Sequence, residues 1–284
     1  MKLSEIVTFF LSSNIFVSLC VVALCQSSAI ILDVNATNLL PFVFFSSLFS
    51  YNFLRFVRFN YSENKDQNLR LTNGQYKWIT LFSAILCIYF SSTLSLSTIM
   101  ILLPAILLTL LYAVRLPIFK TSMALREIPT VKLFLIAFVW SMVTVGIVAN
   151  EHQLLYSLEV LILFLSRFFF VAAITIPFDI RDMGVDPLSM KTIPQRVGVS
   201  RAILISVMFL AVFEVLSIVH FVLFDFHFSL LFALLLCSLC TAYLIYKIDI
   251  AKTRFYYSFW IEGASLLMLV LLFFIPLAFG IFVL

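Results

Sequence analysis

Nine long stretches of apolar residues divide this chain and leave little sequence outside them. A helix that crosses a bilayer needs about 20 consecutive apolar residues, and runs of this kind occupy most of the chain. They lie near residues 6–32, 39–57, 78–94, 96–116, 132–149, 154–178, 201–223, 228–246 and 256–283. We therefore expect an all-α integral membrane protein of about nine transmembrane helices, in which residues 1–284 form a single multi-pass domain.

The composition supports this class of protein. Hydrophobic residues make up 63% of the chain and charged residues 11%, whereas soluble domains are about half apolar and a quarter charged. A membrane-spanning barrel would need strands that alternate apolar and polar residues. Runs such as residues 99–114 do not alternate, so the sequence favours helices.

The basic residues predict the orientation in the membrane. With nine spans, all but one of the 18 basic residues fall at the N-terminus or in loops on one side, and Arg167 is the exception. Because cytoplasmic loops are enriched in lysine and arginine, we expect a cytoplasmic N-terminus, an outer C-terminus and residence in a bacterial inner membrane. The net charge of +4 then reflects topology, and we expect no nucleic-acid partner.

Three aspartates follow the sixth apolar run, in one of the long loops on the cytoplasmic side. Asp179, Asp182 and Asp186 are spaced by three and four residues, which would place them within an arc of about 60° on one helix face. Clustered carboxylates suit Mg²⁺, particularly when phosphate oxygens complete its coordination. The pattern is compatible either with metal–phosphate chemistry or with an ordinary solvated loop.

Neighbouring residues bear on both interpretations. Lys191 and Arg196 follow closely and could bind the remaining charge of a phosphate group. Gly184 and Pro187 weaken a helix here, and a residue that precedes proline is biased out of the α region. Asp186 could therefore lie on a turn.

This segment resembles the second aspartate-rich motif of the UbiA superfamily of intramembrane prenyltransferases. The menaquinone-type form of that motif reads R-D-x-x-x-D, followed by K, T and R-x-G. The matching residues here are Arg181, Asp182, Asp186, Lys191, Thr192, Arg196 and Gly198. Tyr112 and Lys120 form a weaker likeness after the fourth run, and nine spans with long cytoplasmic loops agree with the family along the whole chain.

The resemblance implies a chemistry as well as a fold. In that family, Mg²⁺ and both motifs bind the diphosphate of a polyprenyl donor, and a lipophilic acceptor captures the prenyl group within the membrane. Carried over to this chain, Asp179, Asp182 and Asp186 would hold Mg²⁺. Lys191, Arg196 and Lys120 would contact the diphosphate, and lipid would surround the helices.

The chain departs from the family at the first motif, N-D-x-x-D-x-x-x-D. Asn52 matches the leading asparagine, but Phe53 and Phe56 stand at aspartate positions. Arg55 and Arg58 lie beside them. These arginines could bind diphosphate directly, because guanidinium groups match phosphate oxygens. Equally, they could be ordinary anchors at the end of a span.

Ionisable residues inside spans are candidates for function by default. The prominent ones are Arg167 in the sixth run, Glu214 and His220 in the seventh and Glu262 in the ninth. Arg167 could line a deep cavity with Glu214 or Glu262 as partner, or could form a helix-to-helix pair without contact to substrate. The five cysteines lie within spans without zinc-site spacing, so we interpret them as packing residues.

Three functions remain open from the sequence. The first is a UbiA-like prenyltransferase with a degenerate first motif, and the second is a non-catalytic relative that binds an isoprenoid or another lipid. The third is a small membrane transporter. No motif in the sequence identifies the acceptor or the prenyl chain length.

Overall fold

The computed structural model describes the backbone of residues 3–61, 73–113, 116–118, 121–123, 125, 128, 130–186, 190–224, 227–249 and 252–280. Lys120 and the side chain of Arg58, both predicted to contact diphosphate, lie outside the described residues. The helices are α1 (Leu3–Ser12), α2 (Ile15–Ile31), α3 (Leu40–Tyr61), α4 (Asn73–Ser91), α5 (Leu96–Ala113), α6 (Val131–Ser141), η2 (Met142–Gly146), α7 (Ile147–Glu151), α8 (Leu158–Arg181), α9 (Ile193–Val197), α10 (Val199–Leu223), α11 (Phe228–Tyr246), η4 (Tyr256–Ile261) and α12 (Ala264–Ala278).

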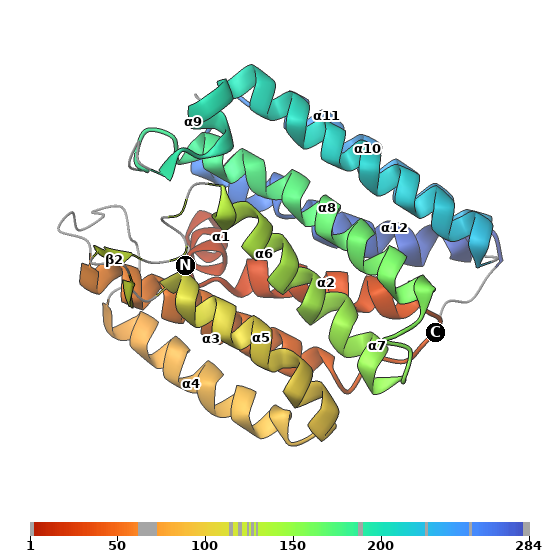
Figure 1. The fold of residues 1–284 in the computed structure, drawn as a ribbon, viewed down its shortest axis with the longest axis horizontal. Coiled ribbons are helices and arrows are strands. Elements are labelled where there is room, and N and C mark those ends of the chain that lie inside the picture. The colour runs from red at the N-terminus through yellow and green to blue at the C-terminus, as the bar shows by residue number, and fades with distance from the viewer. Residues whose placement is uncertain are drawn as a thin grey trace.

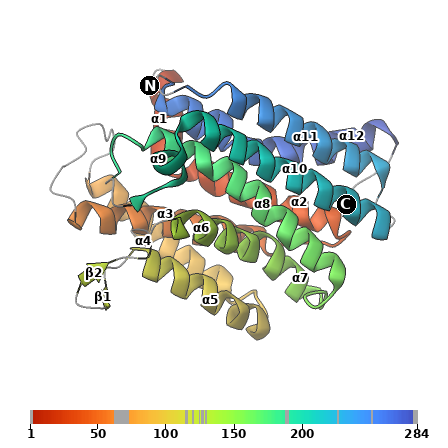
Figure 2. The ribbon, with the colours of Figure 1, turned by 45° about the horizontal axis from the view of Figure 1, so that its top comes forward.

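The helices form one bundle in which contacts follow the order of the chain. Helix α2 packs on α3, which contacts α4 and α5; α5 packs on α6, α6 on α8, α8 on α10, and α10 on α11. Helix α12 contacts both α11 and α2. The last helix of the chain therefore packs against the first long helix and closes the bundle. Two views show α4 and α5 on one side of the bundle and α10 and α11 on the other (Figures 1 and 2).

Each predicted apolar run is occupied by one helix or by consecutive helices. Six helical stretches within the described residues are long and apolar enough to cross a membrane, or seven if α1 and α2, bent by 63°, count as one span. The all-helical, multi-pass class is confirmed, whereas the number of nine spans stays a prediction. Helix α12 runs to the end of the bundle opposite α1 and α9 (Figure 1).

Helix α8 is the centre of the bundle. In its apolar 18-residue stretch, 72% is buried, compared with 28% in that of α10. A helix that is apolar all round is typical of such a central position. Helices α4 and α5 instead present apolar side chains outward; Trp78 is 72% exposed and Ile88 is 73% exposed. An apolar surface of this extent suits lipid.

Two features of the backbone were not predicted from the sequence. Strands β1 (Leu116–Ile118) and β2 (Thr121–Met123) form an antiparallel hairpin in the loop after α5. The π-helices η2 and η4 interrupt two spans, and π-helical turns often occur at functional sites.

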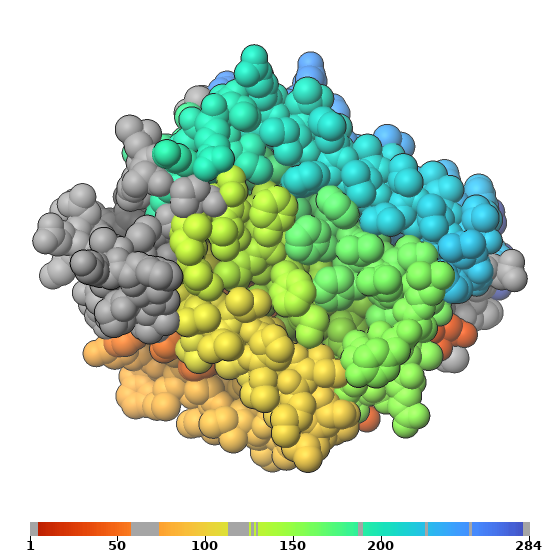
Figure 3. Space-filling model, viewed as in Figure 1, coloured from red at the N-terminus to blue at the C-terminus, as the bar shows by residue number. Residues whose placement is uncertain are grey.

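On the face shown in Figure 3, atoms from α5 (yellow) through α6 and α8 (green) to α10 (blue-green) form a continuous surface.

The end of η4 gives a prediction about stability. A Cβ atom added at Gly263 would lie 2.3 Å from the carbonyl oxygen of Phe259 and 3.5 Å from the ring of Phe16. We expect Gly263→Ala to lower the free energy of unfolding in detergent by about 2 kcal/mol, because the backbone must shift to admit the methyl group. Gly184→Ala is the matched control, since no atom of the described residues lies within 4 Å of its added Cβ. Equal stability of the two variants would contradict this account.

Candidate functional site

The aspartates of the predicted motif lie where α8 ends. Helix α8 finishes at Arg181, and Asp182 is its C-cap, with φ −89° and ψ 1°. Residues 182–186 form turns, so Asp186 lies outside the helix. The expectation that three carboxylates share one helix face is therefore wrong, whereas the expected turn at Asp186 is confirmed. Within the described part of the chain, no group of three acidic, histidine or cysteine side chains is arranged to hold a metal.

Lys132, at the start of α6, joins two of the three aspartates. Its Nζ lies 2.7 Å from Oδ1 of Asp179 and 3.5 Å from Oδ2 of Asp186. Both carboxylates are nearly buried, with side chains 4% and 6% exposed, and the Lys132 side chain is 19% exposed. Buried charges of this kind are stable only when they are paired. The ends of α6 and α8 therefore hold two carboxylates around one cation.

Gln195 connects Asp186 to the start of α9. Its Oε1 accepts a hydrogen bond from the backbone of Thr192 at 3.0 Å, and its Nε2 donates to the carbonyl oxygen of Asp186 at 3.1 Å. A small cavity of about 10 Å³ lies beside the start of α9, with Lys132 and Asp179 among its lining residues. The remaining lining residues are Ile128, Thr130, Leu133, Met190, Thr192 and Ile193.

Asp182 has a different partner from the other two aspartates. The guanidinium of Arg181 donates to both of its carboxylate oxygens, at 2.7 and 2.8 Å. The same guanidinium lies 5.0 Å from the ring centre of Phe178, at cation–π distance. Lys191 and Arg196, two of the predicted diphosphate contacts, are exposed at this end of the bundle, and Arg196 lies in the last turn of the short helix α9.

The residues at the first-motif position form hydrogen bonds to the backbone and side chains where the chain bends between α1 and α2. Asn52 is buried, donates to the carbonyl oxygens of Ser13 (3.1 Å) and Leu48 (2.9 Å), and accepts from Nδ2 of Asn14 (3.0 Å). Asn14 has φ 64°, a left-handed conformation that asparagine tolerates better than most residues. Asn52 therefore connects α3 to the point where the first span bends.

Arg55 acts at the same break. Its Nη1 donates to the carbonyl oxygen of Ser12 at 2.7 Å, and its guanidinium lies 4.7 Å from the ring centre of Tyr76. Ser12 ends α1, and carbonyl groups at a helix end need donors from outside the helix. In the structure, Arg55 thus stabilises the end of α1.

An aromatic pair lies deeper in the bundle than Lys132. Trp140, about 12 Å further along α6, donates from Nε1 to the hydroxyl of Tyr51 at 3.1 Å, and their rings pack edge to face. Helices α3 and α6 thus share a polar aromatic contact in the interior.

The Tyr51–Trp140 pair gives a second prediction. We expect a double-mutant cycle of Tyr51→Phe and Trp140→Phe to give a coupling energy of about 1 kcal/mol in unfolding, because each change removes the same hydrogen bond. Free energies of unfolding of the two single variants and the double variant in detergent provide the test. Strict additivity would show that the bond does not stabilise the fold.

The intramembrane residues have partners other than those expected. Arg167 contacts Ser28 and Met268, and among the described ion pairs it has none with Glu214 or Glu262. His220 instead lies 3.5 Å from the carboxylate of Glu159. Of the two alternatives for Arg167, the pairing with Glu214 or Glu262 is therefore not found, whereas contacts to neighbouring helices are.

Sequence reasoning missed Lys132 and Gln195 as members of the site. Lys132 looked like one of several basic residues at a cytoplasmic boundary, and it lies 47 residues from Asp179. The one feature of the sequence that could have identified Lys132 as a site residue was its position as the first charged residue of an apolar run. Gln195 carried no signal beyond its place inside the K-T-x-x-x-R-x-G pattern.

Comparisons with known proteins identify the fold. No family profile matches the sequence, and no curated protein matches it. Solved structures do match. A UbiA homolog from Archaeoglobus fulgidus bound to GPP and Mg²⁺ aligns with a TM-score of 0.65 at 12% sequence identity. The alignment covers 94% of this chain and 99% of that one. A digeranylgeranylglyceryl phosphate synthase aligns with a TM-score of 0.58 at 16% identity, covering 95% and 98%.

A third structure extends the comparison. The UbiA homolog from Aeropyrum pernix K1 aligns with a TM-score of 0.57 at 13% identity and covers 99% of this chain and 98% of that one. The alignments span nearly the full length of each protein. The chain therefore has the UbiA fold, and the predicted resemblance is confirmed at the level of the fold.

Proposed function

We propose that this protein is an intramembrane prenyltransferase that transfers a polyprenyl group from its diphosphate to a lipophilic acceptor. The observation that carries the proposal is the Lys132–Asp179–Asp186 cluster, two nearly buried carboxylates around one cation. It lies in a fold shared with a homolog that has been solved with GPP and Mg²⁺. The acceptor is a lipophilic molecule that reaches the site from the bilayer.

The residues fit a magnesium ion. Asp179 and Asp186 already hold a cation between them, the ammonium group of Lys132. Two carboxylates, completed by phosphate oxygens and water, are a donor set that Mg²⁺ takes in proteins. Asp179 and Asp186 would therefore hold the ion, which would neutralise charge on the leaving diphosphate.

Other residues would complete the diphosphate site. Lys132 would donate to phosphate oxygens, and Lys191 and Arg196 would add positive charge at the exposed rim of the pocket. Asp182 would act through Arg181, which it holds in a bidentate pair. Arg55 is engaged at the end of α1, so the proposed anion site depends on the second motif.

The prenyl chain would extend between the aromatic residues deeper in the bundle. Trp140 lies about 12 Å along α6 from Lys132, and it contacts Tyr51 on α3. When the C1–O bond breaks, the electron pair leaves with diphosphate and the prenyl group becomes an allylic cation. Aromatic faces stabilise such a charge, and exclusion of water prevents its hydrolysis.

The function is tested by binding of GPP to the purified protein in detergent, with and without Mg²⁺. We expect saturable binding that needs Mg²⁺, and geraniol, which lacks the diphosphate, is the control ligand. Equal binding of GPP and geraniol would instead support the alternative of an isoprenoid-binding protein without transferase activity. Binding of neither would contradict both.

A further inference from the structure

A positively charged side chain is buried near the middle of the bundle without a carboxylate beside it. Arg167 on α8 is 2% exposed, and a guanidinium remains protonated in proteins. No acidic group of the described residues lies within 4 Å of it. The nearest acidic residue on α8 is Glu159, about 12 Å away along the helix axis, and His220 is its partner.

The hydrogen bonds of Arg167 leave part of the guanidinium unsatisfied. Nη2 donates to Oγ of Ser28 at 3.0 Å, and Nη1 donates to the sulfur of Met268 at 3.0 Å. A thioether sulfur is only a weak acceptor. Nε is buried and has no hydrogen-bond partner among the described residues. The group therefore has both an uncompensated charge and an N–H without an acceptor.

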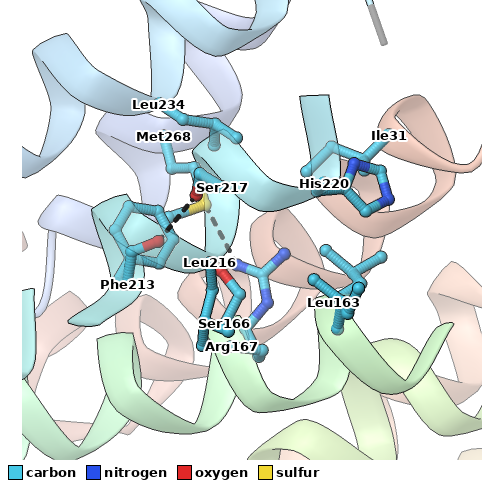
Figure 4. Close-up of a pocket in the computed structure, with 11 residues that line it drawn as sticks. Ile31, Leu163, Ser166, Arg167, Phe213, Leu216, Ser217, His220, Leu234 and Met268 are labelled. Atoms are coloured by element: carbon cyan, nitrogen blue, oxygen red, sulfur yellow. Dashed lines mark hydrogen bonds between the residues drawn. The ribbon is translucent and has the colours of Figure 1, made fainter. Parts of the chain in front are cut away.

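A cavity adjoins this guanidinium. Figure 4 shows Arg167 extending among the residues that line it. Three polar side chains, Ser166, Ser217 and His220, share the lining. The volume is about 10 Å³, which is room for about one water-sized occupant. The other lining residues are Ile31, Ile162, Leu163, Phe213, Leu216, Leu234 and Met268.

We propose that this cavity binds one small monovalent anion of the size of chloride, with Arg167 as its principal ligand. One negative charge would neutralise the guanidinium, and Nε–H would donate to the anion. The Ser166 hydroxyl, which makes no hydrogen bond to the described residues, is available as a second donor. A water molecule would satisfy Nε but leave the buried charge uncompensated, which is costly in a low-dielectric interior.

The surroundings of the cavity disfavour larger anions. Apolar side chains form most of its lining, so the several charged donors that a diphosphate or a phospholipid headgroup needs are not present among the described lining residues. The site is also separate from the Lys132–Asp179–Asp186 cluster, because Arg167 and Asp179 lie about 18 Å apart along α8. The proposal does not depend on the transferase function.

The test compares thermal stability in detergent in sodium chloride, bromide and gluconate at constant ionic strength. We expect both halides to raise the Tm of the wild-type protein by at least about 3 °C over gluconate. Arg167→Met should abolish the halide effect, and the exposed-site control Arg201→Gln should retain it. Equal Tm values of the wild type in all three salts would overturn the proposal, as would a halide effect that persists in Arg167→Met.

A crystal soaked in bromide gives a second readout that needs no variant. We expect an anomalous peak within about 3.5 Å of Nε of Arg167, at hydrogen-bond distance. Density at that position without anomalous signal would identify water and overturn the proposal. Because this result comes from the wild-type protein, it holds even if Arg167→Met does not fold.

Discussion

Replacement of Asp179 by asparagine is expected to weaken binding of GPP in the presence of Mg²⁺ by about 100-fold, or about 2.7 kcal/mol. Asp179 makes the shorter of the two contacts to Lys132, 2.7 Å against 3.5 Å for Asp186. Asparagine keeps the shape of the side chain but removes the charge that would hold the ion. Truncation of one member of a buried charge pair costs about 2–5 kcal/mol. Titration calorimetry on the purified variant is the measurement.

The control for this variant is Asp33→Asn. Asp33 is exposed, follows α2 at the other end of the bundle and has φ 50°, a conformation that asparagine also adopts. It should bind GPP like the wild type. If Asp179→Asn binds GPP with wild-type affinity while remaining folded, the aspartate cluster is not the diphosphate site.

Replacement of Asn52 by leucine is expected to lower the free energy of unfolding by about 3 kcal/mol. The change leaves the carbonyl oxygen of Ser13 and the amide of Asn14 without their partner at the break of the first span. Each buried polar group deprived of its partner costs about 1–3 kcal/mol. Unfolding in detergent, followed by circular dichroism, measures the loss.

A double-mutant cycle separates this role from ligand binding. Asn14→Ala should cost less in the Asn52→Leu background than in the wild type, because the two side chains share one hydrogen bond. Wild-type stability of Asn52→Leu together with lost GPP binding would contradict the structural role. It would place Asn52 in the ligand site instead.

The helical architecture could be predicted because apolar length is a local property. Each apolar run coincides with one helix or a short series of helices, and the aspartates lie at the expected end of α8. The π-helices and the bend at Asn14 could not be predicted in the same way, since they depend on packing between spans. Gly263 illustrates this, because its lack of a side chain matters only beside Phe16 and Phe259.

The candidate site was only partly predictable, since its electrostatic partners are distant in sequence. The D-x-x-D-x-x-x-D spacing suggested three equivalent ligands, but the end of α8 directs Asp182 to Arg181, and Asp179 and Asp186 to Lys132. Lys132 enters from α6, and no spacing rule links it to α8. Arg167 likewise donates to Ser28 on α2, and no spacing rule could decide between this contact and a glutamate partner.

The residues of the altered first motif have a structural role in the fold. Phe53 and Phe56 stand where the family pattern has carboxylates. Beside them, Asn52 and Arg55 hydrogen-bond to the end of α1 and to the bend that follows it. An aspartate at Phe56, which is 41% exposed, would add negative charge near Arg55. The position thus serves the stability of the first span, and the proposed diphosphate site depends on α6, α8 and α9.

The most direct test of the account is release of inorganic diphosphate from GPP by the purified protein with Mg²⁺, in the presence of membrane lipid extract as a source of acceptors. The account predicts release that requires both Mg²⁺ and the extract, transfer of the labelled prenyl group into a lipid product, and loss of both in Asp179→Asn. Tight, Mg²⁺-dependent binding without release under any of these conditions would contradict the transferase proposal. It would identify instead a UbiA-fold protein that binds prenyl diphosphates without turning them over.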